Sequence, residues 1–395
     1  MGNRGTLLLL VLVLFSALVA SVGAYGYEEE KSEQRTQGEK WFLLRQLHNV
    51  VKTDAGSMKM VKGGYRAGSF LHSPMHIGFI SMEPNSLFIP QYLDSDLVIF
   101  VHHELDHIYR DELAERSLKQ GDVYTIPAGS AFYLENRNEN QRLRIICSIA
   151  ELKTFLTRQT SGPIVHLSGS HDTNIWTNFI AQECHKKLAH LKRIVNSVEE
   201  ANPKEKESTW SLRKFLCTLL SRKGFPDFKN EYGWSKNVDE SDYSPLQISG
   251  NGVYLVNLSS GSMMAPHVNP RAIEYGVVLK GTGRIQIVYP NGTLAMNARV
   301  REGDVFWVPR YFPFCQIAST NGHFEFFGFT TSARRNHQQF LVGKNSLMQR
   351  LRGPEFAAAF GIGEKRLKRI TNAQHEQVIL PSSSPTPGDK AIYEF

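Results

Sequence analysis

The chain has 395 residues, of which 41% are hydrophobic and 21% charged, a globular composition with enough length for two or three domains. Its 23 Phe and 14 Tyr can bury enough apolar surface to argue against disorder of the whole chain. The formal net charge is +7 and the pI is near 9.1, but Lys and Arg are interspersed with Asp and Glu. This pattern predicts a solvated surface and argues against a nucleic-acid partner.

Residues 1–24 are predicted to be a signal peptide. Arg4 supplies a positive charge, an apolar run extends from Leu7 to Ala20, and Val22-Gly23-Ala24 is a small-residue cleavage site. A membrane-spanning helix needs about 20 apolar residues, which neither this run nor a later segment provides. We therefore expect the chain to enter the secretory pathway and to have no membrane partner.

One module occurs twice in the chain. The segment Gly121-Asp122-Val123-Tyr124-Thr125-Ile126-Pro127 recurs as Gly303-Asp304-Val305-Phe306-Trp307-Val308-Pro309. In both copies Gly and Asp predict a turn into a strand, and Pro predicts the end of ladder pairing. Short β-rich runs between Gly, Pro and Asn turns surround both copies, which is typical of antiparallel barrels or sandwiches. The modules are predicted over residues 40–150, where the copy is shorter, and 246–343.

The segments between and after the modules have a different texture. Residues 151–245 are predicted to be a helical and charged linker, because Ile175–Val198 and Thr209–Leu220 have apolar residues at helical spacing. A helical extension is expected over residues 344–381, with helices in Leu347–Phe360 and Lys365–Gln377, followed by a flexible tail over residues 382–395. The predicted fold class is therefore all-β, with an α-helical linker and a C-terminal helical extension.

Several segments in combination resemble the vicilin-like (7S globulin) seed storage proteins, which contain two cupin barrels. The segments that carry the resemblance are Met75–Phe79, Pro90–Ser95, Met263–Pro270, Glu274–Gly281, Val308–Pro313 and Ala373–Pro381. The resemblance implies two jelly-roll barrels related by a pseudo-dyad, and helical extensions that hold neighbours in a homotrimer. It also implies a non-enzymatic nutrient reservoir in a protein storage vacuole, with an extracellular location as the alternative.

Cupin enzymes bind a transition metal or zinc through a His-x-His pair, a following Glu and a His in the later motif. In the second module His267 and Glu274 stand at suitable places, but Asn269 replaces the second His, and Arg310-Tyr311-Phe312-Pro313 contains no His. Two ligands rarely hold a catalytic ion, so we expect a vestigial site at His267 and Glu274, no required cofactor, and copper or zinc as the candidate ions. In the first module Gln91 takes the place of His267.

The alternative to storage is a metal-dependent cupin enzyme or a metal- or small-ligand-binding cupin, and a second pattern adds a less favoured alternative, a zinc peptidase. His103-Glu104-Leu105-Asp106-His107 matches the H-E-x-x-H sequence of zinc peptidases, in which two His on one helical face bind zinc and Glu acts as general base. The stretch Phe100–Leu118 could form such a helix. Against it, the second copy has Gly281-Thr282-Gly283 in this neighbourhood, which indicates a β-hairpin, so a loop or irregular strand is the favoured interpretation.

Aromatic and cysteine residues add weaker candidates. The runs Phe306-Trp307 and Phe324–Phe329 could line a small-ligand cavity, but strand alternation favours plain core packing. Cys315 has no identifiable His partner for nucleophilic catalysis, so a buried thiol is expected. The cysteines are too widely spaced for a disulfide framework or a zinc cluster: Cys147, Cys184, Cys217 and Cys315.

Two sequons are consistent with the secretory route. Asn291-Gly292-Thr293 follows Pro290 in a turn, where a glycan would be accessible. Asn257-Leu258-Ser259 lies in an apolar, strand-like run, which predicts an unused site.

Overall fold

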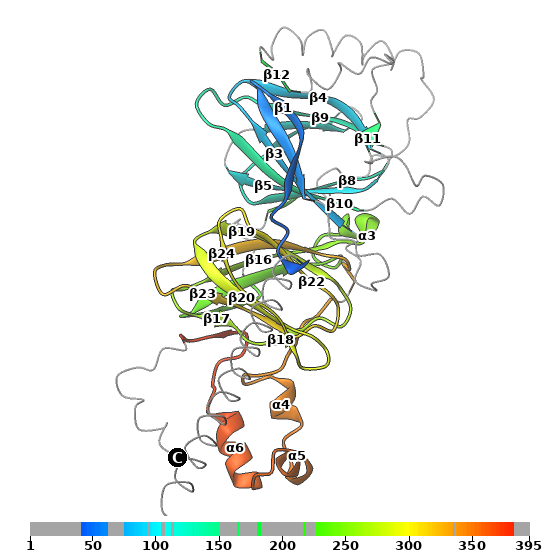
Figure 1. The fold of residues 1–395 in the computed structure, drawn as a ribbon. Helices are drawn as coiled ribbons and strands as arrows, with labels where there is room; N and C mark the ends of the chain where they lie inside the picture. Colours follow the sequence, from blue (N-terminus) through cyan, green and yellow to red (C-terminus); the bar gives the residue numbers. More distant parts are fainter. Residues whose placement is uncertain are drawn as a thin grey trace, which may run out of the picture.

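The computed structural model describes residues 41–61, 75–93, 95–103, 107–111, 114–128, 130–150, 164–165, 180–182, 216–218, 226–334 and 336–382. These residues form two barrels of antiparallel sheets, one above the other, with a small helical extension below the second barrel (Figure 1). The predicted all-β class with two copies of one module is confirmed. No helix of the described ranges combines the length and the apolar character needed to cross a membrane.

The first barrel has a seven-stranded and a six-stranded sheet. The seven-stranded sheet has the order β1 (Leu47–Thr53), β2 (Gly56–Val61), β3 (Met75–Met82), β10 (Leu143–Ala150), β5 (Leu97–His103), β8 (Asp122–Ile126) and β13 (Leu216–Thr218). The six-stranded sheet has the order β11 (Ile164–Val165), β4 (Ser86–Leu93), β9 (Ala131–Asn136), β6 (His107–Asp111) and β7 (Ala114–Leu118), and β12 (Ile180–Gln182) also pairs with β4.

The second barrel repeats this strand order. One sheet has the order β14 (Phe228–Asn230), β15 (Gly233–Val238), β16 (Gly252–Leu258), β24 (Phe324–Thr330), β19 (Glu274–Lys280) and β22 (Val305–Val308). The other has the order β21 (Leu294–Arg301), β20 (Thr282–Val288), β23 (Phe314–Ala318), β17 (Met263–Met264) and β26 (Ile379–Leu380), while β18 (His267–Val268) pairs with β23 and β25 (Gln339–Phe340).

The repeated Gly-Asp pair makes the same turn in both barrels. Gly121 and Gly303 both have a φ of 85°, a left-handed conformation that glycine adopts without steric cost. Asp122 then accepts a hydrogen bond from the backbone N of Lys119 at 2.7 Å, and Asp304 accepts one from Arg301 at 3.1 Å. The turn predicted from the repeat is therefore confirmed at the level of individual hydrogen bonds.

Strands at the junction of the barrels are buried on both faces. In β5, Leu97, Ile99 and Val101 belong to the interior of the first barrel, whereas Val98 and Phe100 pack into the core of the second. The rings of Phe100 and Phe327 stack with centroids 3.9 Å apart. A strand covered on both faces needs apolar residues at every position, which explains the unbroken apolar run of β5.

The N-terminal segment of the described chain packs against the second barrel, although the sequence placed it in the first module. Leu43 forms a β-bridge with Phe306, and the backbone N of Leu44 donates to Val305 O at 2.8 Å. Phe42 is fully buried in the second core. Because β1 follows at once in the first barrel, this short segment ties the two barrels together.

The predicted linker also contributes strands to the barrels, which corrects its boundaries. Residues 180–182 and 216–218 form β12 and β13 of the first barrel, so helical spacing is the wrong interpretation at these positions. β14 and β15 pair with each other and with β16, so the second sheet begins before residue 246. The rest of Ile175–Val198 and Thr209–Leu220 lies outside the described residues.

The C-terminal extension contains short helices rather than the two longer ones expected. They are α4 (Leu347–Arg350), α5 (Pro354–Ala359) and α6 (Glu364–Asn372), and a further short helix, α3 (Leu246–Ser249), precedes β16. Gly353 and Pro354 separate α4 from α5, because Pro is tolerated at the first helical position but not inside a helix. After α6 the chain returns to the barrel, where Ile379 and Leu380 pair with β17.

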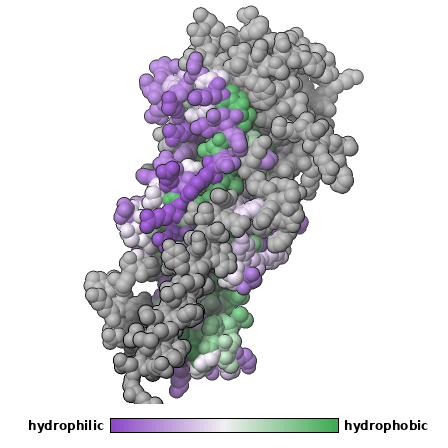
Figure 2. Space-filling model, viewed as in Figure 1, coloured by the Kyte–Doolittle hydropathy of each residue, from purple (hydrophilic) through white to green (hydrophobic). Residues whose placement is uncertain are grey.

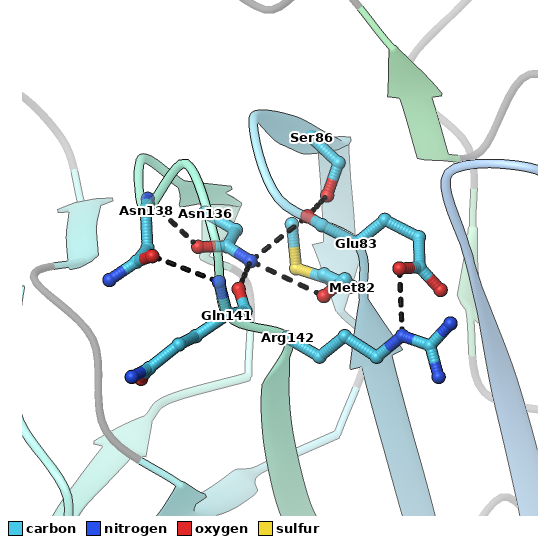
Figure 3. Close-up of polar contacts among 7 residues, drawn as sticks. All are labelled: Met82, Glu83, Ser86, Asn136, Asn138, Gln141 and Arg142. Atoms are coloured by element: carbon cyan, nitrogen blue, oxygen red, sulfur yellow. Dashed lines mark hydrogen bonds and ion pairs between the residues drawn. The ribbon is translucent and has the colours of Figure 1, made fainter.

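In the first barrel, a buried amide joins two turns at one end (Figure 3). Asn136 is fully buried, and its Nδ2 donates to the backbone oxygens of Met82, Glu83 and Gln141 at 3.3, 2.9 and 3.0 Å. Its Oδ1 accepts from the backbone N of Asn138 at 3.1 Å. One side chain thus satisfies backbone groups of both the β3–β4 and the β9–β10 turns.

Candidate functional site

His267 and Glu274, the two residues predicted to form a vestigial metal site, lie in the second barrel. His267 belongs to β18, and Glu274 is the first residue of β19. Both residues are buried. The sequence therefore located two buried polar side chains, and their hydrogen bonds decide what they can do.

The His267 imidazole is held in one orientation by its backbone neighbour. Its Nδ1 lies 2.7 Å from Ala265 O, which can only accept, so Nδ1 carries the proton and Nε2 presents a lone pair. Nε2 is buried without a hydrogen-bond partner among the described residues. The ring packs 4.1 Å from that of Phe314 and 5.5 Å from that of Phe340, and burial lowers its pKa from 6.5 to about 4.

The Glu274 carboxylate is enclosed by amide donors. Asn269 Nδ2 donates to Oε1 at 2.8 Å, and Gln338 Nε2 lies 3.0 and 3.1 Å from the two oxygens. Asn269 is itself fixed, because its Oδ1 accepts from the backbone N of Arg271 and Ala272. Burial raises the pKa of Glu274, and the two amide hydrogen bonds oppose that rise. Both carboxylate oxygens thus already have donors.

These residues do not fit a catalytic metal. Across the described part of the chain, no group of three or more His, Cys, Asp or Glu side chains is placed to hold an ion. Asn269 offers its amide nitrogen to Glu274 and its oxygen to the backbone, so the residue that replaces the second His is already fully engaged. Catalytic zinc sites use three protein ligands, and this cluster provides one imidazole and one amide-bound carboxylate.

The Cupin family model matches residues 219–368, which include β14 and β15 as well as the site. A vicilin-like seed storage protein of Arabidopsis thaliana is 41% identical over 88% of this chain and 81% of its own length. A second one from the same plant is 30% identical over 86% of this chain and 74% of its own length. The chain belongs to the vicilin-like seed storage proteins. It is therefore a seed storage globulin, as its resemblance to that family implied.

Solved globulins have the same fold as this storage protein. Vicilin from hazelnut, Corylus avellana, superposes with a TM-score of 0.69 at 23% identity, covering 87% of this chain and 99% of the hazelnut chain. The 7S globulin of Momordica charantia gives a TM-score of 0.67 at 22% identity, covering 87% of this chain and 98% of its own. The two-barrel cupin architecture is thus shared over most of the chain.

The peptidase pattern lacks the helix that it requires. His103 is the last residue of β5 and His107 the first of β6, and these strands belong to different sheets of the globulin. Residues 104–106 lie outside the described part. The alternative helix over Phe100–Leu118 is wrong, because β6 and β7 pair as a hairpin. Two His at the ends of separate strands do not share the helical face on which the zinc-peptidase mechanism depends.

The cysteine and aromatic candidates of the globulin are core residues. Burial raises the pKa of Cys315 to about 11 and that of Cys147 to about 12, so both are thiols at neutral pH. Cys184 lies outside the described residues, and the side chain of Cys217 is not described. The aromatic runs at Phe306-Trp307 and Phe324–Phe329 contribute fully buried rings to the second core, which confirms core packing.

The two sequons differ in their surroundings. Asn291 is exposed, and its Oδ1 accepts from Thr293 N at 3.1 Å and Oγ1 at 2.8 Å, which leaves its amide nitrogen toward solvent. Asn257 lies in β16, and its Nδ2, the atom that would carry a glycan, donates to Glu325 at 2.8 Å. Asn291 therefore remains the favoured glycosylation site.

Sequence reasoning missed Gln338 as a member of this site. It lies 64 residues after Glu274 and reaches it from the segment just before β25, whose pairing with β18 is a long-range contact. No spacing rule connects the two positions, so the sequence contained no signal for this hydrogen bond.

Proposed function

We propose that this globulin acts as a non-enzymatic nutrient reservoir that is stored as a homotrimer in the protein storage vacuole. Removal of residues 1–24 and attachment of a glycan at Asn291 belong to the same proposal, since both follow from passage through the secretory pathway. Storage requires a dense core, buried chain edges and surfaces that associate, and it requires no reactive group.

The proposal of a trimer rests on exposed apolar side chains of the C-terminal helical extension. Leu351 is 53% exposed, Phe360 54% and Ile370 58%, and Leu347 is 46% exposed. Figure 2 shows hydrophobic surface over the α4–α5 part of the extension. An apolar patch of this kind is typical of a protein–protein interface. We propose that a second copy of the chain covers this apolar patch, because the similar solved proteins include vicilins and a 7S globulin.

The hydrogen bonds around Glu274 support a non-enzymatic role. A general base or metal ligand needs a carboxylate that can reach substrate or ion, and Asn269 and Gln338 occupy both oxygens of this one. The buried thiols add no nucleophile, because their raised pKa values keep them protonated.

Sedimentation velocity on the mature chain tests the oligomer. We expect one species with the mass of three chains, and we expect Leu351→Ser combined with Ile370→Ser to shift it to smaller species. Leu294→Ser is the matched control, because Leu294 is 44% exposed but belongs to β21 of the barrel and not to the extension. A wild-type monomer, or an equal shift in the control, would contradict the trimer.

Metal analysis tests the non-enzymatic part. We expect protein purified without chelators to contain only substoichiometric copper or zinc. A stoichiometric ion that is lost on His267→Ala would overturn this expectation. Cleavage after Ala24 and the vacuolar location are tested by N-terminal sequencing and by immunolocalisation in the seed.

A further inference from the structure

A groove of about 1060 Å³ lies on the outer face of the second barrel, over β20, β21, β23 and β17. This sheet is on the side of the second barrel that faces away from the first (Figure 1). Four of the residues that line the groove are arginines: Arg45, Arg284, Arg299 and Arg301. Neither the cupin site nor the proposed trimer contact uses these side chains.

The strand register places like charges side by side in this groove. Arg284 of β20 is the direct cross-strand partner of Arg299 of β21, and both are exposed. Like charges directly opposite each other destabilise a sheet. At the equivalent position of the first barrel, the register places Ile108 opposite Ser117, and neither residue is charged. The second barrel thus has a repulsive pair where the first has an uncharged one.

The groove contains little negative charge to balance its arginines. Asp304 is the one acidic residue among the described residues that line it. Its Oδ2 accepts from the backbone N of Arg301 and lies 3.8 Å from Arg45 Nη2. Within the described part of the chain, no carboxylate forms an ion pair with Arg284, Arg299 or Arg301. Among the described residues, these three guanidinium groups on one face therefore have no ion-pair partner.

Hydroxyl and amide groups lie at one end of the same groove. Thr282, Ser319, Thr320 and Asn321 line it beside the arginines. Backbone hydrogen bonds hold this end in place, because Ser319 N donates to Thr282 O at 3.0 Å. Arginine forks and hydroxyl groups together form a donor set that suits phosphate oxygens.

We propose that this groove binds a compact polyphosphate anion. Neighbouring strands lie ~5 Å apart and alternate residues of a strand ~7 Å apart, so Arg284, Arg299 and Arg301 present three positive charges within a few ångströms. A chain of linked phosphates has a matching density of negative charge, whereas the carboxylates of an acidic peptide are more widely spaced. Binding would relieve the repulsion between Arg284 and Arg299. A storage protein with this groove would hold phosphorus as well as nitrogen.

Isothermal titration of the intact oligomer with sodium tripolyphosphate tests the proposal. At 0.15 M NaCl we expect one site per chain, binding at least tenfold tighter than inorganic phosphate, and weakening as salt rises. Arg284→Gln combined with Arg299→Gln is expected to weaken binding at least tenfold. The matched control is Lys229→Gln with Lys280→Gln, which removes the same charge from exposed positions on the opposite sheet and leaves binding unchanged.

A second readout separates loss of the site from loss of the fold. Without ligand, the Arg284→Gln/Arg299→Gln protein is expected to melt at the same or a higher temperature than wild type, because a repulsive pair has been removed. Tripolyphosphate should raise the melting temperature of wild type and of the lysine control only. Equal weakening in both double variants would show diffuse attraction and overturn the site. Tighter binding of hexaglutamate than of tripolyphosphate would overturn the ligand class.

Discussion

The two barrels share their strand order but differ in how their edges and ends are held. The edge strand β8 of the first barrel is covered by β13, while the corresponding strand β22 is covered by a bridge from Leu43. An uncovered edge strand is open to pairing with other chains. Repeated modules can therefore keep one topology while unrelated segments of the chain complete each copy.

The ends of the barrels show the same contrast. In the first barrel, Asn136 joins the β3–β4 and β9–β10 turns from a buried position. In the second, the corresponding turns are joined by Ser260, whose exposed hydroxyl donates to Thr320 O at 2.5 Å. Loss of the Asn136 hydrogen bonds should cost more stability than loss of the Ser260 hydrogen bond. The reason is that water cannot replace the missing partner of a buried polar group.

Among substitutions at equivalent positions of the two barrels, we expect the largest difference in stability at Trp307, which contacts the N-terminal segment. Trp307 is fully buried and its Nε1 donates to Trp41 O at 2.6 Å, whereas the repeat has Thr125 at the same position. Trp307→Ala should lower the free energy of unfolding by about 3 to 5 kcal/mol through loss of packing. Thr125→Ala removes a buried hydroxyl that has no hydrogen-bond partner among the described residues, and should change the free energy of unfolding by less than about 1 kcal/mol. Urea unfolding followed by circular dichroism compares the two; equal losses would refute this asymmetry.

Acid sensitivity should also distinguish the barrels. His267 is buried, and its pKa falls from 6.5 in the unfolded chain to about 4 in the fold, whereas Gln91 at the corresponding position of the first barrel does not titrate. Between these pH values the unfolded chain binds more protons, so stability decreases as pH falls from 6.5 toward 4. The loss by pH 4.5 should be about 2 to 3 kcal/mol.

His267→Gln tests this pH dependence, because it gives the second barrel the residue of the first. The variant should lose less stability than wild type between pH 7 and pH 4.5, as measured by urea unfolding at both values. The raised pKa of Glu274 acts in the opposite direction, since it favours the fold at low pH and this contribution is lost as pH rises. Glu274 is present in both proteins, so the comparison isolates His267. Parallel pH profiles would contradict the prediction.

Asn136→Ala should weaken the first barrel by about 2 kcal/mol, because three backbone oxygens lose a donor. The melting temperature and the unfolding free energy measure the effect. Asn140→Ala is the control: it changes an exposed amide of the same turn and should have no measurable effect.

The smallest loss of stability is expected at Ser260, which joins the equivalent turns of the second barrel. Ser260→Ala should cost only about 0.5 kcal/mol, since water can satisfy Thr320 O at an exposed site. The same unfolding measurement applies. A loss as large as that of Asn136→Ala would mean that the two ends are held equally firmly.

The candidate site was only partly accessible to sequence reasoning. The spacing identified His267, Asn269 and Glu274, because these residues lie close together in the chain. It did not identify Gln338, which reaches Glu274 only through the long-range pairing of β25 with β18. The H-E-x-x-H pattern misled for the same reason, since periodicity alone does not tell whether His103 and His107 share a helix or end two separate strands.

By itself, the sequence determined that one β-rich module occurs twice, because the Gly-Asp turn needs a left-handed glycine and Pro limits the strand that follows. It also indicated an incomplete metal site, because the ligand types are visible in the chain. Only the tertiary structure decided which segments complete each sheet, how Trp41 to Leu44 cross to the second barrel, and where Arg284 and Arg299 meet. These features depend on contacts between distant residues, which form when apolar faces are buried and which local propensity does not specify.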